Sequence, residues 1–400
     1  MSWETVELGK VTSKIGSGVT PRGGASVYIS EGTALIRSQN ILDLEFSESG
    51  LAYISDEHAA SMKSHCVIPG DVLLNITGDS TGRVVMWDRQ CPAVVNQHVS
   101  IIRPKPEQVN SRWLQYFLVQ ESTKRYLLTL AASGGSRPAL TKGMLSALQI
   151  PLPPLSQQDA IAEVLGALDD KIAANQRVLQ LANELIQNKV LKASLGSVFV
   201  PLREVTTSIV RGVAPKYSEE GCYVVNQKCI RDQSVSLTGA RQLSNFPRNE
   251  SKILKISDVL VNSTGMGTLG RAARWTNPLE HCTADSHVSI VRFSADKVDP
   301  DFAGALLVSR EPMIEDLAEG STGQTELRRD LLGSLELPLP DIEIQRKVGD
   351  LIRTLDESNN ALTQENQVLA RTRDELLPLL MNGKISVAEA NEAVEGVVGK

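Results

Sequence analysis

A chain of 400 residues is too long for one ordinary domain and predicts two or three. Its 42% hydrophobic and 22% charged residues are typical of a globular protein and exclude a disordered one. The net charge is −6. Residues 1–150 sum to +1, 151–196 to −1, 197–337 to −2 and 338–400 to −4, so composition gives no support to a nucleic-acid binder.

Export and membrane signals are missing from the sequence. No apolar run approaches the roughly 20 residues of a membrane helix, and the first residues lack the basic and apolar regions of a signal peptide. The five cysteines include no C-x-x-C pair, which favours reduced thiols over disulfides or zinc. We therefore expect a cytoplasmic protein that has neither a membrane segment nor a metal site.

An internal repeat of about half the chain length is the strongest pattern. The matches occur in the same order with similar separations, which predicts a gene duplication. They are Val6–Thr12 with Val200–Thr206, Gly18–Pro21 with Gly212–Pro215, Asp71–Gly78 with Asp258–Gly265, Gly82-Arg83 and Trp87 with Gly270-Arg271 and Trp275, His98–Arg103 with His287–Arg292, and Leu148–Pro153 with Leu335–Pro340.

Each copy is expected to be a mixed α and β domain. Val, Ile and Leu-rich runs bounded by Gly, Asn and Asp predict strands at 71–76, 84–87, 98–103, 258–262 and 287–293. Helical stretches follow near 111–130 and 301–318.

After each Pro-Leu-Pro the apolar period changes from two to about three and a half, which predicts a long helix. The first seam is Ile161, Leu165, Leu168, Ile172, Asn175, Leu179, Ala182 and Ile186. The second is Val348, Ile352, Leu355, Asn359, Leu362, Asn366, Leu369, Arg373, Leu376 and Leu380. Two such stripes should pair with each other as an antiparallel coiled coil, in which the asparagines fix the register. The alternative is that each helix packs only on its own domain.

The predicted fold class is α+β, with two similar domains joined by two long helices and related by a pseudo-twofold axis. The expected segments are a first domain (1–150), a first spacer helix (151–196), a second domain (197–337), a second spacer helix (338–385) and a C-terminal tail (386–400). A helix of about 30 residues extends roughly 45 Å, and one turn of B-DNA separates half-sites by about 34–36 Å. Two domains on such a spacer would suit two separated DNA segments.

Over essentially its whole length the chain resembles the specificity subunit of type I restriction-modification enzymes. The resemblance is carried by Pro151-Leu152-Pro153-Pro154-Leu155-Ser156-Gln157-Gln158, by the weaker second copy Pro338–Gln345, and by the elements Asp71–Arg83 and Asp258–Arg271. The second copy lacks the proline after Pro340, and Gln157 stands where the family more often has Glu.

The resemblance implies two target-recognition domains, each of which reads one half of a bipartite, asymmetric double-stranded DNA site. The helices would set the gap and dock two methyltransferase subunits, which methylate adenine N6 with S-adenosylmethionine. Two motor-nuclease subunits that use ATP and Mg²⁺ would join for restriction. It implies no catalysis and no cofactor in this chain.

Two motifs invite a catalytic interpretation that their context disfavours. Gly265–Gly270 is a G-x-G-x-x-G, but its duplicate Gly78–Gly82 lacks the middle glycine and no helical pattern follows, so a tight turn is favoured over a dinucleotide site. His98 and His287 are equivalent, and a structural imidazole bonded to neighbouring backbone is favoured over a general base. The adenine-methyltransferase and ATP-binding motifs are absent from the sequence.

Candidate DNA contacts are Arg, Asn, Gln and Lys residues in Gly-rich loops, because Arg bonds guanine bidentately and Asn or Gln bonds adenine. In the first domain they are Arg22, Arg37, Gln39, Asn40, Arg83 and Arg137. In the second they are Arg211, Lys216, Asn226, Gln227, Lys228, Arg231, Arg271 and Gln324. Arg83 and Arg271 recur in both copies, which favours a scaffold or phosphate role over sequence discrimination.

Three other functions stay open at this point. The chain could be an enzyme that acts alone, a scaffold whose paired domains bind polypeptides, or an orphan subunit that supports methylation without restriction.

Overall fold

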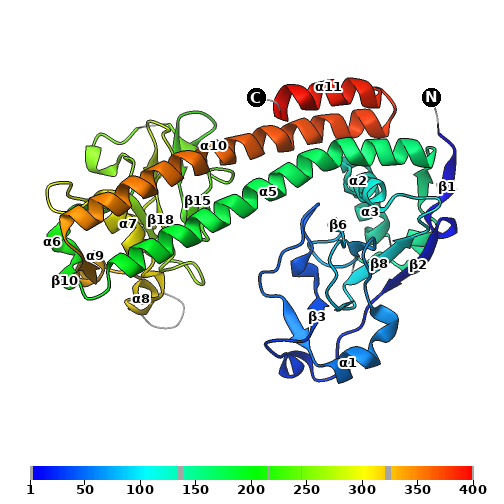
Figure 1. Cartoon of the computed structure of the whole chain (residues 1–400), viewed down its shortest axis with the longest axis horizontal. Helices are drawn as coiled ribbons and strands as arrows, with labels where there is room; N and C mark the ends of the chain where they lie inside the picture. The colour runs from blue at the N-terminus through cyan, green and yellow to red at the C-terminus, as the bar shows by residue number, and fades with distance from the viewer. Residues whose placement is uncertain (1–2, 134–137, 215, 245, 320–325, 399–400) are drawn as a thin grey trace. The chain divides into compact units, whose positions relative to one another are not determined.

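A computed structural model describes residues 3–133, 138–214, 216–244, 246–319 and 326–398. The chain forms two compact units (Figure 1). Unit 1 comprises Met1–Ala173 and Asn366–Lys400, and unit 2 comprises Ala174–Glu365. We call the part of each unit that lies outside the two long helices its head, residues 1–154 in unit 1 and 194–341 in unit 2. The domain bounds expected from the sequence stay a prediction.

Each head is built on a four-stranded antiparallel sheet of the same order. In unit 1 the order is β2 (Thr12–Ser17), β8 (Val99–Pro104), β5 (Val72–Asn75) and β6 (Val84–Met86). In unit 2 it is β11 (Thr206–Arg211), β20 (Val288–Phe293), β17 (Val259–Asn262) and β18 (Ala272–Arg274). Both sheets have one register shift at the same place, between Thr12 and Lys14 and between Thr206 and Ser208. The predicted mixed α and β fold of both copies is confirmed.

Both faces of these sheets are covered, which explains the continuous apolar runs in the sequence. In β5, Val72 and Leu74 join the core beneath the helices, while Leu73 joins a second core on the opposite face. The repeated tryptophans Trp87 and Trp275 lie in the second core of their own head, and each is only 1% exposed.

Smaller sheets complete each head. In unit 1 they are β4 (Ala52–Ile54), β3 (Thr33–Ile36) and β7 (Ala93–Val95), with β3 parallel to β7, and the pair β1 (Thr5–Glu7) and β9 (Gln149–Pro151). In unit 2 they are β12 (Tyr217–Ser218), β16 (Arg241–Leu243), β13 (Cys222–Val225) and β19 (Thr283–Ala284), with β13 parallel to β19, and the pair β10 (Val198–Pro201) and β21 (Glu336–Leu339). Unit 2 also has the hairpin β14 (Ile230–Arg231) and β15 (Ser234–Val235).

The Gly-Val-x-Pro motif of each copy is explained by a close approach of two backbones. A Cβ atom on Gly18 would lie 1.7 Å from the carbonyl oxygen of Val95, and one on Gly212 would lie 2.0 Å from that of Ala284. Only glycine fits at either place, because these oxygens belong to the strand segments that the glycines cross.

Short helices pack on one face of each main sheet. In unit 1 they are α2 (Ser111–Val119), α3 (Glu121–Ala132) and α4 (Lys142–Ser146), and in unit 2 they are α7 (Pro300–Val308), α8 (Glu311–Asp316) and α9 (Arg329–Ser334). Each helical stretch predicted near 111–130 and 301–318 is broken in two. The first stretch breaks at Gln120, which has extended backbone (ψ 139°). The second breaks before Pro312 in the first turn of α8, because proline has no backbone N–H with which to extend α7 into α8. Unit 1 also has α1 (Asp56–Ser61), and unit 2 has α6 (Leu202–Val205) in the place of the 3₁₀ turn η1 (Leu8–Lys10).

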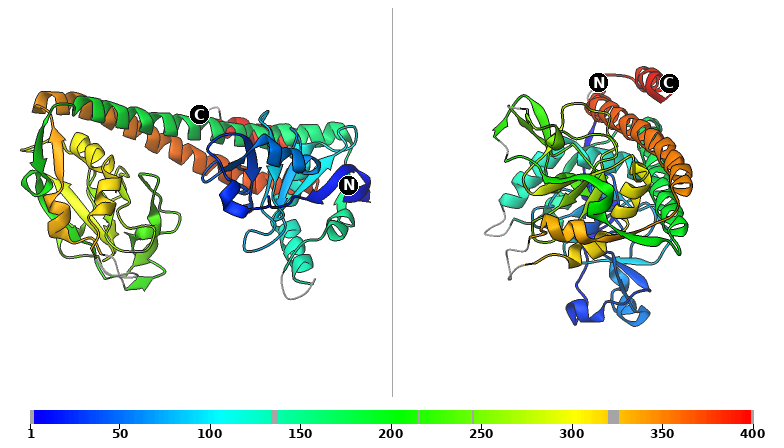
Figure 2. Two further views of the ribbon diagram at one scale, coloured as in Figure 1. Left: turned by 90° about the horizontal axis from the view of Figure 1, so that it is seen from below. Right: turned by 90° about the vertical axis from the view of Figure 1, so that its left-hand side faces the viewer.

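The two long helices are α5 (Leu155–Ala193) and α10 (Ile342–Met381), which run side by side (Figure 1 and Figure 2). In unit 1, Asp169 of α5 pairs with Arg373 of α10 at 2.7 Å. In unit 2, Asn175 donates to Glu365 at 2.6 Å. The partners on α10 run backwards as α5 runs forwards, so the helices are antiparallel and the paired-helix prediction is confirmed. The pseudo-twofold relation of the two units stays a prediction.

Every predicted seam position of both helices is buried or half-buried. In unit 1, Leu165 and Leu168 share a core with Leu369 and Leu376. In unit 2, Ile186 shares a core with Ile352. The helices have 39 and 40 residues, against the about 30 used for the length estimate, and extend about 60 Å each.

The segment expected to be a C-terminal tail contains a helix, α11 (Val387–Val398). Its Ala390 and Val394 join the core of unit 1 together with Leu380 and Met381 at the end of α10. The helix α11 lies beside that end of α10 (Figure 1). No helix among the described residues has the length and apolar character needed to cross a membrane.

Candidate nucleic-acid interface

The glycine-rich segments are turns between antiparallel strands. Gly78 and Gly82 connect β5 to β6 with φ values of 74° and 87°. Gly265, Gly267 and Gly270 connect β17 to β18 with φ values of 103°, 69° and 86°. A strand follows each turn, whereas a dinucleotide site needs the N-terminus of a helix there. The tight-turn interpretation is confirmed.

Beside each turn lies a threonine–histidine pair. The Thr77 hydroxyl lies 2.6 Å from Nδ1 of His98, and the Thr264 hydroxyl lies 2.8 Å from Nδ1 of His287. The backbone N–H of each histidine donates to the side chain two residues before it, Asn96 or Asp285. The expected backbone partner of the imidazoles is therefore wrong, because a hydroxyl group from the neighbouring strand end takes that place.

In unit 1 this corner opens into a hollow of about 890 Å³. Its lining residues are Ser38, Gln39, Thr77, Gly78, Asp79, Ser80, Arg83, His98, Pro138 and Ala139. Among the residues that the structure describes, Arg83 has no hydrogen-bond or ion-pair partner, so its charge is available to a ligand. In unit 2, Arg271 donates to the carbonyl oxygen of Gly267 at 2.9 Å, and Gln227 donates to the Thr264 hydroxyl at 2.8 Å.

A buried asparagine holds the neighbouring loop to each sheet. Asn75 at the end of β5 donates to the carbonyl oxygen of Ser38 at 2.8 Å, and Asn262 at the end of β17 donates to that of Gln227 at 3.1 Å. Both asparagines are fully buried. These bonds fix the 3₁₀ turns η3 (Ser38–Asn40) and η5 (Gln227–Cys229), and so place the candidates Gln39 and Lys228 at the surface.

The other candidates of the first domain are placed differently from one another. Arg22 is exposed. Arg37 is half-buried, stacks 5.5 Å from the ring centre of Tyr28 and donates to the carbonyl oxygen of Gly50. Asn40 is fully buried, and its amide bonds the backbone of Arg37, Ser47 and Ser49, so it fixes the loop and presents no surface to a base. Arg137 lies outside the described residues.

In the second domain Lys216, Lys228 and Arg231 are exposed, while Asn226 is half-buried and accepts a bond from the Lys228 backbone. Arg211 is engaged already: it pairs with Glu326 at 2.8 Å and donates to the carbonyl oxygen of Leu327 at 2.9 Å. Burial lowers the pKa of Arg211, and Glu326 opposes that shift. Gln324 lies outside the described residues.

An arginine-rich hollow of about 790 Å³ surrounds Arg211. Three further arginines line it, Arg203, Arg328 and Arg329, together with the acidic Glu326 and Asp330. Sequence reasoning missed these three. The Arg328-Arg329 doublet, separated by two residues from the Gly-Ser-Thr-Gly-Gln-Thr segment before it, was the available signal for two of them.

One buried ion pair recurs in both heads. Arg103 forms two hydrogen bonds to Asp71 at 2.7 and 2.8 Å, and Arg292 forms two to Asp258 at 2.8 and 2.7 Å. Burial raises the pKa of Asp258, whereas Arg292 and the backbone N–H of Lys255 act in the opposite direction. The two carboxylates are 0% and 1% exposed, so this pair belongs to the scaffold.

A buried glutamine joins each head to its long helix. Gln158 accepts from the backbone of Asn110 at 2.9 Å and donates to the carbonyl oxygen of Pro153 at 2.9 Å. Gln345 accepts from the backbone of Asp299 at 3.1 Å and donates to that of Pro340 at 2.7 Å. The Pro-Leu-Pro motif with its later glutamine is therefore a head-to-helix joint.

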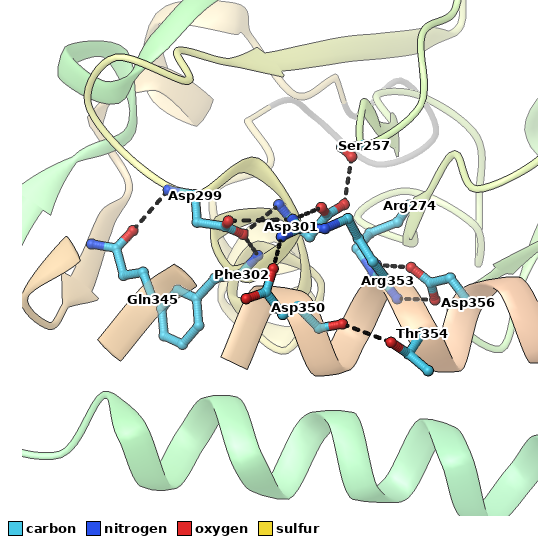
Figure 3. Close-up of polar contacts among 10 residues, drawn as sticks. All are labelled: Ser257, Arg274, Asp299, Asp301, Phe302, Gln345, Asp350, Arg353, Thr354 and Asp356. Atoms are coloured by element: carbon cyan, nitrogen blue, oxygen red, sulfur yellow. Dashed lines mark hydrogen bonds and ion pairs between the residues drawn. The ribbon is translucent and has the colours of Figure 1, made fainter. Parts of the chain in front are cut away.

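Charged pairs extend this joint in unit 2 (Figure 3). Arg353 of α10 contacts Asp301 at 2.6 Å and Asp299 at 3.3 Å, and the bond to Asp301 raises the pKa of Arg353. Arg274 of β18 forms two bonds to Asp356 of α10 at 2.5 and 2.7 Å, with side chains only 10% and 13% exposed. Burial raises the pKa of Asp356, and Arg274 opposes that shift.

Comparisons with known proteins agree with this architecture. Residues 2–184 match the family model described as type I restriction modification DNA specificity domain. A putative type I restriction enzyme MjaX specificity subunit from Methanocaldococcus jannaschii is 22% identical over 96% of this chain and 94% of that protein. The MjaVIII specificity subunit of the same organism is 23% identical over 88% of this chain and 87% of its own length.

Among solved structures, the S subunit of a type I restriction-modification system from M. genitalium is similar with a TM-score of 0.59 and 16% identity. The match covers 94% of this chain and 96% of that one. At this identity the likeness concerns the fold.

Proposed function

We propose that the chain is a specificity subunit of a type I restriction-modification enzyme, and that its two units divide DNA recognition between them. Each head reads one half of a bipartite, asymmetric DNA site. The observation that carries this proposal is that the two heads have the same sheet order but different loops. The turn η3 has Ser38-Gln39 where the turn η5 has Gln227-Lys228. Side chains that differ at equivalent loop positions suit half-sites of different sequence.

The paired helices set the gap between the two half-sites. Antiparallel contacts hold α5 to α10 within unit 1, through Asp169 and Arg373, and within unit 2, through Asn175 and Glu365. Helices of 39 and 40 residues extend about 60 Å, which suffices to bridge half-sites about one DNA turn (34–36 Å) apart.

This chain carries no catalysis under the proposal, and the chemistry belongs to its partners. Two methyltransferase subunits with S-adenosylmethionine and two motor-nuclease subunits with ATP and Mg²⁺ join it in the cytoplasm. The methyltransferases dock on the helices. Val178, Leu181 and Leu185 support that docking, because their spacing puts them on one face of α5 while they are 50%, 46% and 40% exposed.

Exchange of a head tests the division of the site. Residues 1–173, which include the part of α5 that belongs to unit 1, are replaced by those of a relative with a known target, and adenine methylation is mapped in cells that carry the chimaera and its methyltransferase. We expect exactly one half of the methylated motif to change. A change in both halves would contradict the proposal.

Insertion of four residues beside Asn175 tests the gap. The insert adds about one helical turn, roughly 6 Å, so we expect a longer gap between unchanged half-sites in the same mapping. An insertion of four residues in the exposed Gly239 loop, outside the helices, is the control. A gap of unchanged length in the α5 variant would show that the helices do not measure it.

Two measurements separate the alternative functions. A protein-binding scaffold would retain no duplex DNA even with the methyltransferase present. An enzyme that acts alone would methylate DNA without partners when given S-adenosylmethionine.

A further inference from the structure

We propose that each head holds one DNA phosphate with the same sequence-independent device, made of the threonine–histidine pair and the arginine after the glycine turn. In unit 1 this phosphate device is Thr77, His98 and Arg83, and in unit 2 it is Thr264, His287 and Arg271. The inference rests on the proposed function, because it assigns a role within DNA recognition.

Comparison of the two duplicated heads distinguishes the possible roles of a residue. Heads that read different sequences must differ in their base-reading side chains, so residues kept in both serve either the fold or the phosphates, which are the same in every sequence. The buried shared residues, such as Asp71 and Asp258, belong to the fold. His98 is half-buried and His287 is exposed, so packing in the core does not account for the histidines.

In unit 2 the hydrogen bonds of Thr264 are compatible with an imidazole that donates from Nε2. Gln227 donates to the Thr264 hydroxyl, whose oxygen lies against Nδ1 of His287; in the tautomer that accepts the hydroxyl proton at Nδ1, the N–H is on Nε2. An N–H donor at the surface suits a phosphate oxygen. In unit 1 the amide nitrogen of the exposed Gln97 donates to Nε2 of His98 at 3.2 Å, so this side chain must turn away and Nε2 must carry the proton before His98 can donate to a phosphate.

The arginine supplies the charge. Arg83 lines the same hollow as Thr77 and His98 and has no partner among the described residues. Arg271 leaves the equivalent turn and is held by one bond to the Gly267 carbonyl oxygen, which orients its guanidinium; its charge also acts on the carboxylate of Glu311. A guanidinium beside a neutral N–H donor is a common arrangement for a phosphate.

The acidic Asp79 also lines the hollow in unit 1 and would repel a phosphate. It is exposed, and the exposed Met266 stands in the equivalent turn of unit 2, so the carboxylate is not part of the shared device. A carboxylate accepts a bond from the cytosine amino group, which places Asp79 among the residues that differ between the half-sites.

Charge removal in both heads tests the device. Full-length chain with its methyltransferase is titrated with the cognate duplex and with a random duplex at several salt concentrations. For Arg83→Gln/Arg271→Gln we expect affinity for both duplexes to fall by the same factor, about tenfold or more. The salt slope should decrease by roughly 0.9 for each lost phosphate contact. The methylated motif should stay the same.

Further variants distinguish a phosphate contact from other roles. Arg83→Lys/Arg271→Lys should recover most of the affinity, because lysine holds a phosphate but does not bond guanine bidentately. The variant His98→Gln/His287→Gln should lower the affinity for both duplexes by the same factor and leave the salt slope unchanged. Lys63→Gln, a charge removal outside the hollow, is the matched control. Thermal unfolding of each variant verifies that it is folded.

Several results would overturn the inference. Loss of cognate affinity alone, or a changed motif, would assign these residues to base reading. Unchanged affinity for both duplexes would make them purely structural. If the unmodified complex retained no duplex at all, the proposed function itself would fail, which is a different outcome.

Discussion

The joints between head and helix begin with the same buried glutamine in both units, but one pair of equivalent positions carries charges of opposite polarity. In unit 1 the head supplies the cation: Arg112 of α2 bonds Asp170 of α5 at 3.1 Å. At the equivalent place in unit 2 the head supplies an anion, since Asp301 of α7 pairs with Arg353 of α10, although Arg274 of the same head supplies a cation to Asp356. Counted from the shared glutamines Gln158 and Gln345, the position of Arg353 in α10 corresponds to Gly166 in α5.

Space explains that exchange. A Cβ atom on Gly166 would lie 2.5 Å from Nη1 of Arg112, so the glycine makes room for the guanidinium. In unit 2 the shorter Asp301 leaves room for Arg353 to come from the helix. Each head is therefore matched to its own helix segment, and a head moved onto the other helix would bring Arg112 against Arg353. For this reason the head exchange proposed above includes the helix up to residue 173.

The largest expected effect is at the buried pair of unit 2. Asp356→Ala leaves Arg274 buried without a counter-charge, and we expect a loss of about 3–5 kcal/mol of unfolding free energy. Unit 1 has Met86 at the equivalent strand position, paired with Val72 as Arg274 is with Val259. The matched control Arg274→Met/Asp356→Leu should therefore stay within about 1 kcal/mol of the unmodified chain. Denaturant unfolding measures both, and an equal loss in the two variants would contradict the explanation.

The shared glutamines should behave alike in the two units. Gln158→Ala and Gln345→Ala each remove a buried amide from backbone partners, and we expect each to cost about 1–3 kcal/mol. The exposed Gln180→Ala on the same helix as Gln158 serves as the control. Hydrogen exchange of the backbone amides of Asn110 and Asp299, read by mass spectrometry, localises the loss. A loss of unfolding free energy in only one of the two variants would show that the glutamines do not have the same role in the two joints.

A smaller effect is expected when the charge that the unit 1 head supplies at position 112 is reversed. Arg112→Asp places like charges together, but Asp170 is 64% exposed and solvent screens the repulsion, so we expect a loss of only about 1 kcal/mol. Addition of Gly166→Arg recreates the pairing of unit 2 and should recover part of that loss. A double-mutant cycle measures the coupling between the two positions. Zero coupling would show that polarity does not match a head to its helix.

Much of the fold could be predicted from the sequence. The duplication, the strands of the main sheets and the two long helices follow from patterns along the chain, because strand and helix impose different apolar periods on the residues that they bury. The seam positions cover only residues 161–186 and 348–380, and the helices of 39 and 40 residues extend beyond them at both ends. The break at Gln120 has no clear local signal in the sequence.

The candidate site was predictable only as residue types in loops. Sequence gave no reason to separate Asn40, which is buried with its amide bonded to backbone, from Gln39, which is exposed next to it. It also could not find the hydroxyl partners of His98 and His287, which lie 21 and 23 residues earlier in the chain.

By itself, the sequence determined that this protein has two copies of one α and β fold and two helices that pair, because repetition and apolar period are properties of the order of residues. Only the tertiary structure decided which side chains of those copies meet. The Arg112–Asp170 and Arg353–Asp301 pairs and the Thr–His pairs depend on distances between segments far apart in the chain. Contacts of that kind are fixed when helices and sheets pack against one another, and no local pattern encodes them.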